Sequence, residues 1–163
     1  MSVVAAKVYT DKIVVAADSI IVKGWSKRNS GFSKIESING MIVGGCGTAQ
    51  ESSLLWRYMQ THQPETATVK DILGFMVEFS KWKREIIGDS SVDNSYLMAY
   101  NGHLFEIESM FVHEITDYIA IGAGADFANA ALYLGHTPKE AVKVACDLSC
   151  FVNEPICEFE MGR

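Results

Sequence analysis

Ser2 is the first residue of the chain whose type and position could support catalysis. It follows the initiator Met1, and removal of Met1 would place a hydroxyl and a free α-amine on one residue. An α-amine has a reference pKa of about 8, so it can act as a base near neutral pH, and a hydroxyl paired with such an amine can be an activated nucleophile. Because many proteins begin with Met-Ser, this interpretation needs support from other residues.

Two charged residues supply that support. Asp18 ends the apolar segment VVAAD sixteen residues after Ser2, and Lys34 lies thirty-two residues after Ser2 in an apolar setting. A lysine that points inward needs a partner, because an unpaired buried ammonium is costly, and Asp18 is a candidate. Such a lysine would also lower the pKa of a neighbouring α-amine by like-charge repulsion. Taken singly, each of these charges is more often a surface residue.

A glycine-rich segment, GGCG at residues 44–47, leads from a strand pattern into a helix pattern. Glycines let backbone N–H groups approach a reacting carbonyl, and the start of a helix favours negative charge. The segment is therefore a candidate oxyanion hole. The alternative is a plain strand-to-helix turn. Nucleotide binding is disfavoured, because GGCGT lacks the complete P-loop and dinucleotide patterns.

The apolar patterns place these residues on an α+β scaffold of one domain, residues 1–163. Strands are predicted at 2–8, 12–17, 32–37, 41–45, 95–100, 103–107, 111–115, 118–121 and 156–161. Helices are predicted at 48–61, 69–87, 125–134 and 137–150, and residues 19–31 are expected to be mostly loop. Strands that come in blocks, separated by pairs of helices, are typical of packed sheets covered by helices.

Composition limits the classes of function. The 163 residues are 48% hydrophobic with a net charge of −6, which suits a compact domain and argues against a nucleic-acid partner. No apolar run approaches the roughly 20 residues of a membrane span, and the N-terminus lacks the features of a signal peptide. The cysteines and histidines lack metal-site spacing. We therefore expect a cytoplasmic protein with no metal and no membrane partner.

Together, these residues resemble the proteasome β-subunits and, more closely, HslV, the peptidase subunit of a bacterial two-component ATP-dependent protease. The similarity runs over nearly the whole chain. The spacing from Ser2 to Asp18 and to Lys34 matches this family without a gap. The segments that carry the similarity are VVAADS, the Lys34-Ile35 pair, MIVGGCGTAQES, DYIAIGAGADFANAALYL and KEAVKVACDL.

The resemblance implies an α+β fold of the four-layer αββα sandwich type found in N-terminal-nucleophile (Ntn) hydrolases. It also implies a ring-shaped homo-oligomer that hydrolyses peptide bonds without a cofactor. Carried over by position, Ser2 would attack and its own amine would serve as the base. Asp18 and Lys34 would set the local field, and the Gly47 N–H would hold the oxyanion.

The resemblance also implies a substrate and partners. Gly45 and Cys46 would belong to the substrate-binding pocket, and the missing side chain of Gly45 suggests a roomy one. The substrate would be a polypeptide, and a separate AAA+ unfoldase would be needed for folded proteins, because nothing in this chain indicates ATP hydrolysis.

Three departures from the family pattern leave alternatives open. The nucleophile is Ser where most members have Thr, Ala123 stands where the family has a serine, and Phe151 stands where it has an aspartate, with Asp147 one turn earlier. The second hypothesis is therefore a catalytically weak, ring-forming subunit. The third is an Ntn amidase that acts on a small amide. We expect no long propeptide, so that removal of Met1 alone would expose Ser2.

Overall fold

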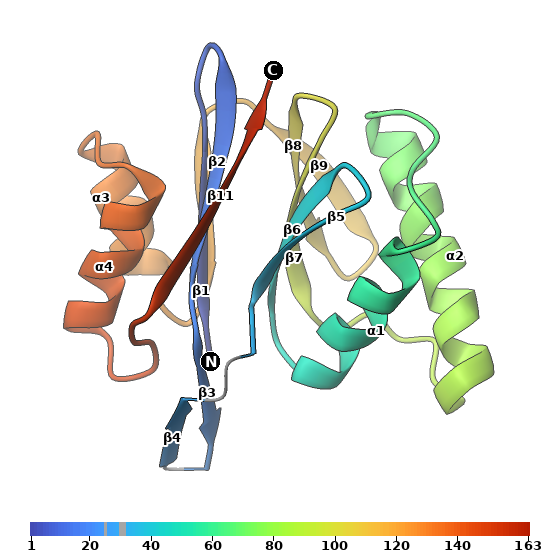
Figure 1. Cartoon of the computed structure of the whole chain (residues 1–163), viewed down its shortest axis with the longest axis horizontal. Coiled ribbons are helices and arrows are strands. Elements are labelled where there is room, and N and C mark those ends of the chain that lie inside the picture. Colours follow the sequence, from blue (N-terminus) through green and yellow to red (C-terminus); the bar gives the residue numbers. More distant parts are fainter. Residues whose placement is uncertain (25, 30–31) are drawn as a thin grey trace.

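The computed structural model describes residues 1–24, 26–29 and 32–163. Two antiparallel sheets lie face to face between two pairs of helices (Figure 1). The first sheet contains, in order, β10 (Tyr118–Gly122), β1 (Val3–Val8), β2 (Lys12–Asp18) and β11 (Ile156–Gly162). The second contains β5 (Ile35–Ile38), β6 (Met41–Cys46), β7 (Ser95–Tyr100), β8 (His103–Glu108) and β9 (Phe111–Ile115).

The helices cover the outer faces of the sheets. α3 (Ala125–Tyr133) and α4 (Pro138–Leu148) lie on the first sheet. α1 (Ala49–Met59) and α2 (Val69–Ile87) lie on the second (Figure 1). The predicted α+β, four-layer αββα sandwich is confirmed.

The strand sequences explain why the layers form. Successive side chains of a strand point to opposite faces. In β1, Val3 and Ala5 pack toward the α3–α4 pair, whereas Val4 and Ala6 pack toward the second sheet. Because both faces of β1 and β2 are covered, these two strands contain continuous apolar runs, VVAA in β1 and IVVAA in β2. Three apolar clusters fill the three spaces between the four layers.

Threonine caps define the starts of three helices. Thr48, Thr68 and Thr137 each accept a hydrogen bond from a backbone N–H of the first helical turn. At α4 the Glu140 side chain completes a capping box, with Pro138 in the first turn, as the Thr-Pro-Lys-Glu sequence indicates. The cap at Thr48 fixes the start of α1 directly after Gly47.

The prediction for residues 19–31 is wrong in part. A two-stranded hairpin forms there from β3 (Ile20–Lys23) and β4 (Ser26–Asn29), while residues 25, 30 and 31 lie outside the described part of the chain. The sequence SKRN contains no apolar residue that would predict a strand. β4 forms because its backbone pairs with that of β3. The strand predicted at 32–37 begins only at Ile35.

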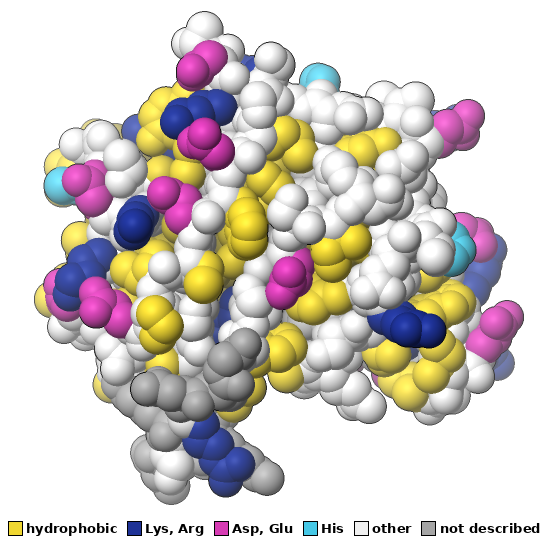
Figure 2. Space-filling model, viewed as in Figure 1, with side chains coloured by type: hydrophobic (Ala, Val, Ile, Leu, Met, Phe, Trp, Pro, Cys, Tyr) yellow, Lys and Arg dark blue, Asp and Glu magenta, His cyan; other side chains and the backbone are white. Residues whose placement is uncertain are grey.

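The described surface is chemically mixed on the face that Figure 2 shows. Acidic and basic side chains alternate there with apolar ones over β2, β11 and the neighbouring helices. In the described part of the chain, no helix combines the length and the apolar character needed to cross a membrane.

Candidate active site

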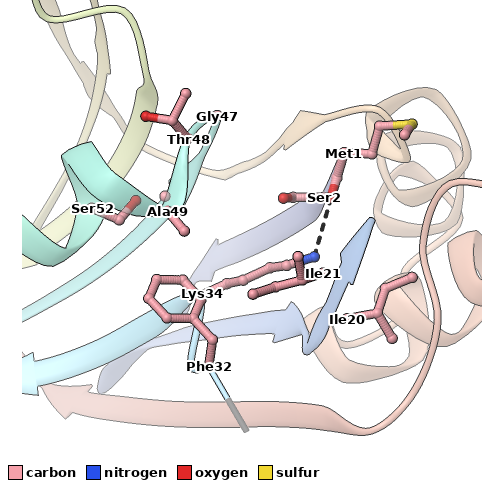
Figure 3. Close-up of a pocket in the computed structure, with 11 residues that line it drawn as sticks. Met1, Ser2, Ile20, Ile21, Phe32, Lys34, Gly47, Thr48, Ala49 and Ser52 are labelled. Carbon is pink, nitrogen blue, oxygen red and sulfur yellow. Dashed lines mark hydrogen bonds between the residues drawn. The ribbon is translucent and has the colours of Figure 1, made fainter. Parts of the chain in front are cut away.

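A cavity of about 290 Å³ lies where the start of β1 meets the end of β6 and the start of α1. It brings together four of the six predicted site residues: Ser2, Lys34, Gly45 and Gly47. Figure 3 shows the Ser2 hydroxyl directed into the cavity, on the side where Gly47, Thr48 and Ser52 lie. The remaining lining residues are Met1, Ile20, Ile21, Phe32, Thr48, Ala49 and Ser52.

A buried ion pair lies beside this cavity. The Lys34 Nζ donates to Asp18 Oδ2 at 2.7 Å, and both side chains are at most 5% exposed. The other carboxylate oxygen, Oδ1, accepts the backbone N–H of Val3 at 2.9 Å. The Lys34 Nζ also donates to the carbonyl oxygen of Met1 at 3.3 Å (Figure 3). Lys34 therefore lies next to the peptide bond that links Met1 to Ser2.

The loop between β10 and α3 holds the backbone of Ser2. The Gly124 N–H donates to the Ser2 carbonyl at 3.2 Å. Gly122 has φ +93°, and a Cβ at this position would lie 2.4 Å from the same carbonyl oxygen, so a side chain there would displace Ser2. Ala123 lies between these two glycines, which places the loop that carries it against Ser2.

Gly47 adopts a backbone conformation that favours glycine, with φ +143°. It lines the cavity and directly precedes Thr48, the N-cap of α1. A Cβ on Gly47 would lie 1.9 Å from the Asn94 Oδ1. The position is thus restricted to glycine by its backbone and by its neighbour. It also lies at a helix N-terminus, which stabilises negative charge.

Gly45 lines the cavity, and the roomy substrate pocket expected there stays a prediction. A Cβ there would lie 2.8 Å from the Tyr96 ring and 3.0 Å from the Ser52 Oγ, so these side chains already fill the space. Cys46 is not among the described residues that line the cavity. Its side chain lies in the core between the sheets, near the carbonyl of Ile121, and burial raises the pKa of its thiol to about 12.

A second buried polar cluster, which the sequence did not predict, lies next to Gly47. The Glu51 carboxylate accepts from Lys83 Nζ at 3.1 Å and from Tyr96 Oη at 3.0 Å. It also accepts the backbone N–H groups of Asp93 and Asn94, at 3.1 and 3.0 Å. One signal could have revealed it: Lys83 follows Phe79 by four residues, on the buried face of α2.

The two residues considered as a second aspartate position lie away from the cavity. Asp147 pairs with Lys143 on the exposed side of α4, and Phe151 is exposed. Among the described residues, no three His, Cys, Asp or Glu side chains are grouped so that they could hold a metal ion. The polar groups at the cavity include the Ser2 hydroxyl and the Lys34 side chain.

The fold resembles solved structures of proteasome-like proteins. Thiobacillus denitrificans BPH, a bacterial proteasome homologue, in complex with epoxomicin has a TM-score of 0.88 and 19% identity over 98% of each chain. A second structure of this protein has a TM-score of 0.87 and 20% identity over 98% of this chain and 97% of that one. Eukaryotic HslV from Trypanosoma brucei has a TM-score of 0.72 and 19% identity over 99% of each chain.

These comparisons establish the fold as that of the proteasome-like Ntn hydrolases. More narrowly, it is the fold of HslV and the bacterial proteasome homologue, and the resemblance seen in the sequence is confirmed at this level. No family model and no curated protein matches the sequence. At identities of 19–20%, the roles of individual residues have to be argued from this chain.

Proposed function

We propose that the chain is an N-terminal serine peptidase whose nucleophile is the Ser2 hydroxyl after removal of Met1. The observation that carries the proposal is the position of Ser2. Its hydroxyl is directed into a cavity at the point where the buried Asp18–Lys34 pair reaches the Met1–Ser2 peptide bond. A buried ammonium next to a future α-amine favours the neutral, basic form of that amine.

The chemistry follows from these positions. The freed α-amine takes the proton of the Ser2 hydroxyl while the oxygen bonds to the substrate carbonyl carbon. The negative charge that develops on the carbonyl oxygen is stabilised by the Gly47 N–H at the start of α1. The tetrahedral intermediate then expels the amine half of the substrate, which takes the proton. Water hydrolyses the resulting ester and regenerates Ser2.

The surface of the chain supports assembly into a homo-oligomeric ring. Several large apolar side chains of α3 and α4 are exposed, and a groove of about 160 Å³ lies between these helices. Exposed apolar patches of this kind are typical of protein–protein contacts. The most exposed of these side chains are Tyr133, Leu134 and Leu148. A native mass several times that of the 18.0 kDa chain would establish the assembly.

The substrate we propose is a polypeptide, and the compartment is the cytoplasm. The four cysteines are unpaired, which suits a reducing environment. A separate AAA+ unfoldase stays a prediction from the resemblance. None of the described residues at the site is proposed to contact such an ATPase.

The test is the intact mass of the purified protein before and after incubation with epoxomicin. This peptide epoxyketone needs a free α-amine and an adjacent hydroxyl on one residue to form its ring adduct. We expect loss of Met1 and one adduct per chain in the wild type, and none in Ser2→Ala. Ser19→Ala is the matched control, because Ser19 is also buried but bonds to Cys157. A chain with Ser2 free and unlabelled would contradict the proposal.

One observation favours the second candidate, a ring-forming subunit with weak catalysis. Ala123 occupies the centre of the loop that contacts Ser2, and it offers no side-chain hydrogen bond to the amine. On this hypothesis the native mass would still be that of a ring, but epoxomicin would not label Ser2. The two measurements together therefore separate the candidates.

A further inference from the structure

The segment that carries Gly47 is held from outside the cavity by one side chain. Asn94 precedes β7, and its Oδ1 accepts the backbone N–H of Thr48 at 2.7 Å. Its Nδ2 donates to the carbonyl oxygen of the same Thr48 at 2.9 Å and to the Ser52 Oγ at 3.1 Å. One amide thus holds both backbone polar groups of the residue that follows Gly47.

The fit between Asn94 and Gly47 is close on both sides. Asn94 is 1% exposed, and its Oδ1 lies 1.9 Å from the position that a Cβ on Gly47 would take. Of the ordinary side chains of this size, only an amide offers an acceptor and two donors in one plane. An aspartate has the same shape but no N–H, so it would face the Thr48 carbonyl with an oxygen.

Asn94 is itself fixed by the buried carboxylate of Glu51. The Asn94 backbone N–H donates to Glu51 Oε1 at 3.0 Å, and the Lys83 ammonium donates to Oε2 at 3.1 Å. Glu51 lies in the first turn of α1, three residues after Thr48. The loop, the helix start and Asn94 therefore form one hydrogen-bonded unit, and its buried groups are expensive to leave unpaired.

We propose that Asn94 is a positioning residue that sets the direction of the Gly47 N–H for the oxyanion. This inference rests on the function proposed above. Asn94 is not among the described residues that line the cavity, so it acts through Thr48 and Gly47 rather than on the substrate. Loss of one oxyanion donor costs about 10²–10³-fold in rate, and a displacement of about 1 Å can cost about 10²-fold.

The experiment compares two reagents that attack Ser2 differently. Epoxomicin reacts at a ketone carbon, so an oxyanion forms next to Gly47. A peptide vinyl sulfone reacts at an alkene carbon and forms no such oxyanion. In Asn94→Asp we expect labelling of Ser2 by epoxomicin to slow by about 10²-fold, as expected for a misplaced donor, with vinyl sulfone labelling within about threefold of wild type.

Asn129→Asp is the matched control. Asn129 holds Ala120 by the same two-sided arrangement, with Oδ1 accepting at 2.8 Å and Nδ2 donating at 3.1 Å, but it does not contact Gly47. We expect the ratio of the two labelling rates in this variant to equal that of the wild type. If Asn94→Asp does not fold, Asn94→Ser replaces it with the same expectation.

Two results would overturn the inference. One is an unchanged ratio in the Asn94 variant, and the other is an equal slowing of both reagents, which would indicate a general effect on Ser2 or the fold. A wild type that neither reagent labels is a different failure, because it would refute the proposed nucleophile itself.

Discussion

The described part of the chain contains two buried carboxylate–lysine pairs, and they differ in what surrounds them. The Asp18–Lys34 pair lies at the cavity, and Lys34 also reaches the Met1 carbonyl. The Glu51–Lys83 pair lies behind the Gly47 loop, and neither of its residues is among the described residues that line that cavity. Both pairs are at most 5% exposed. Burial of an ion pair therefore does not by itself place it at the cavity.

What distinguishes the two pairs is the number of partners already bound. The Glu51 carboxylate accepts four hydrogen bonds, and Lys83 also donates to the Ser91 carbonyl and pairs with Asp89. Burial lowers the pKa of Lys83, but Glu51 and Asp89 raise it more, so its pKa lies above the usual value. Lys83 therefore stays charged, and its ammonium is bound by Glu51, Asp89 and the Ser91 carbonyl. Lys34, by contrast, lines the cavity and donates to the carbonyl oxygen of Met1, on the peptide bond that precedes Ser2.

The largest effect that tests this contrast is expected for Lys34→Met. Groups that assist proton transfer typically contribute about 10²–10⁴-fold, so we expect the rate of Ser2 labelling by epoxomicin to fall by about 10³-fold per folded molecule. Lys83→Met is the matched control, because it removes an equally buried ammonium from the other pair. There we expect a loss of stability with labelling within about tenfold of wild type, since the Asn94 hydrogen bonds to Thr48 remain.

The contrast would be refuted if both lysine variants lost labelling to the same extent. Urea unfolding of each variant, followed by circular dichroism, gives the folded fraction to which the labelling rates are normalised. Without this correction, loss of fold could be taken for loss of catalysis.

The sequence was sufficient for the first pair and not for the second. Asp18 and Lys34 could be predicted because they interrupt apolar strand segments and have the family spacing from Ser2. Glu51 follows the helix cap Thr48, where an acidic residue is ordinarily a surface group that complements the helix dipole. Only the packing of α2 against the start of α1 buries it with Lys83.

The role of Asn94 and the β3–β4 hairpin also could not be predicted from local sequence patterns. Asn94 lies in the polar segment DSSVDNS, which has the composition of an ordinary loop, and its contact with Thr48 spans 46 residues of sequence. The strands β3 and β4 form from residues expected to be loop, because pairing with a neighbour outweighs weak local propensity. Local pattern predicts the elements well where burial is continuous, and long-range polar contacts are invisible to it.

The next effect concerns stability. Glu51→Gln keeps the shape of the side chain but removes the buried carboxylate of the pair, so that the more exposed Asp89 is the remaining acidic partner of the Lys83 ammonium. Removing one member of a buried pair typically costs about 3–5 kcal/mol, so we expect a clear fall in the urea midpoint. The double variant Glu51→Gln/Lys83→Met should recover part of the loss, because it also removes the buried ammonium that has lost the Glu51 carboxylate. If the two single effects simply added, the pair would have no coupling and the comparison would fail.

The smallest effect is expected at the loop that holds Ser2. The Asp18–Lys34 pair has fewer hydrogen-bond partners than the Glu51–Lys83 pair. Ala123→Ser would add one polar group near Ser2, between Gly122 and Gly124. A hydrogen bond to a charged group contributes about 1.5–3 kcal/mol, so a serine that reaches the Ser2 amine would raise the epoxomicin labelling rate about tenfold. The control is Ala125→Ser, one step into α3. An unchanged rate in Ala123→Ser would mean that Lys34 and Asp18 alone set the state of the amine.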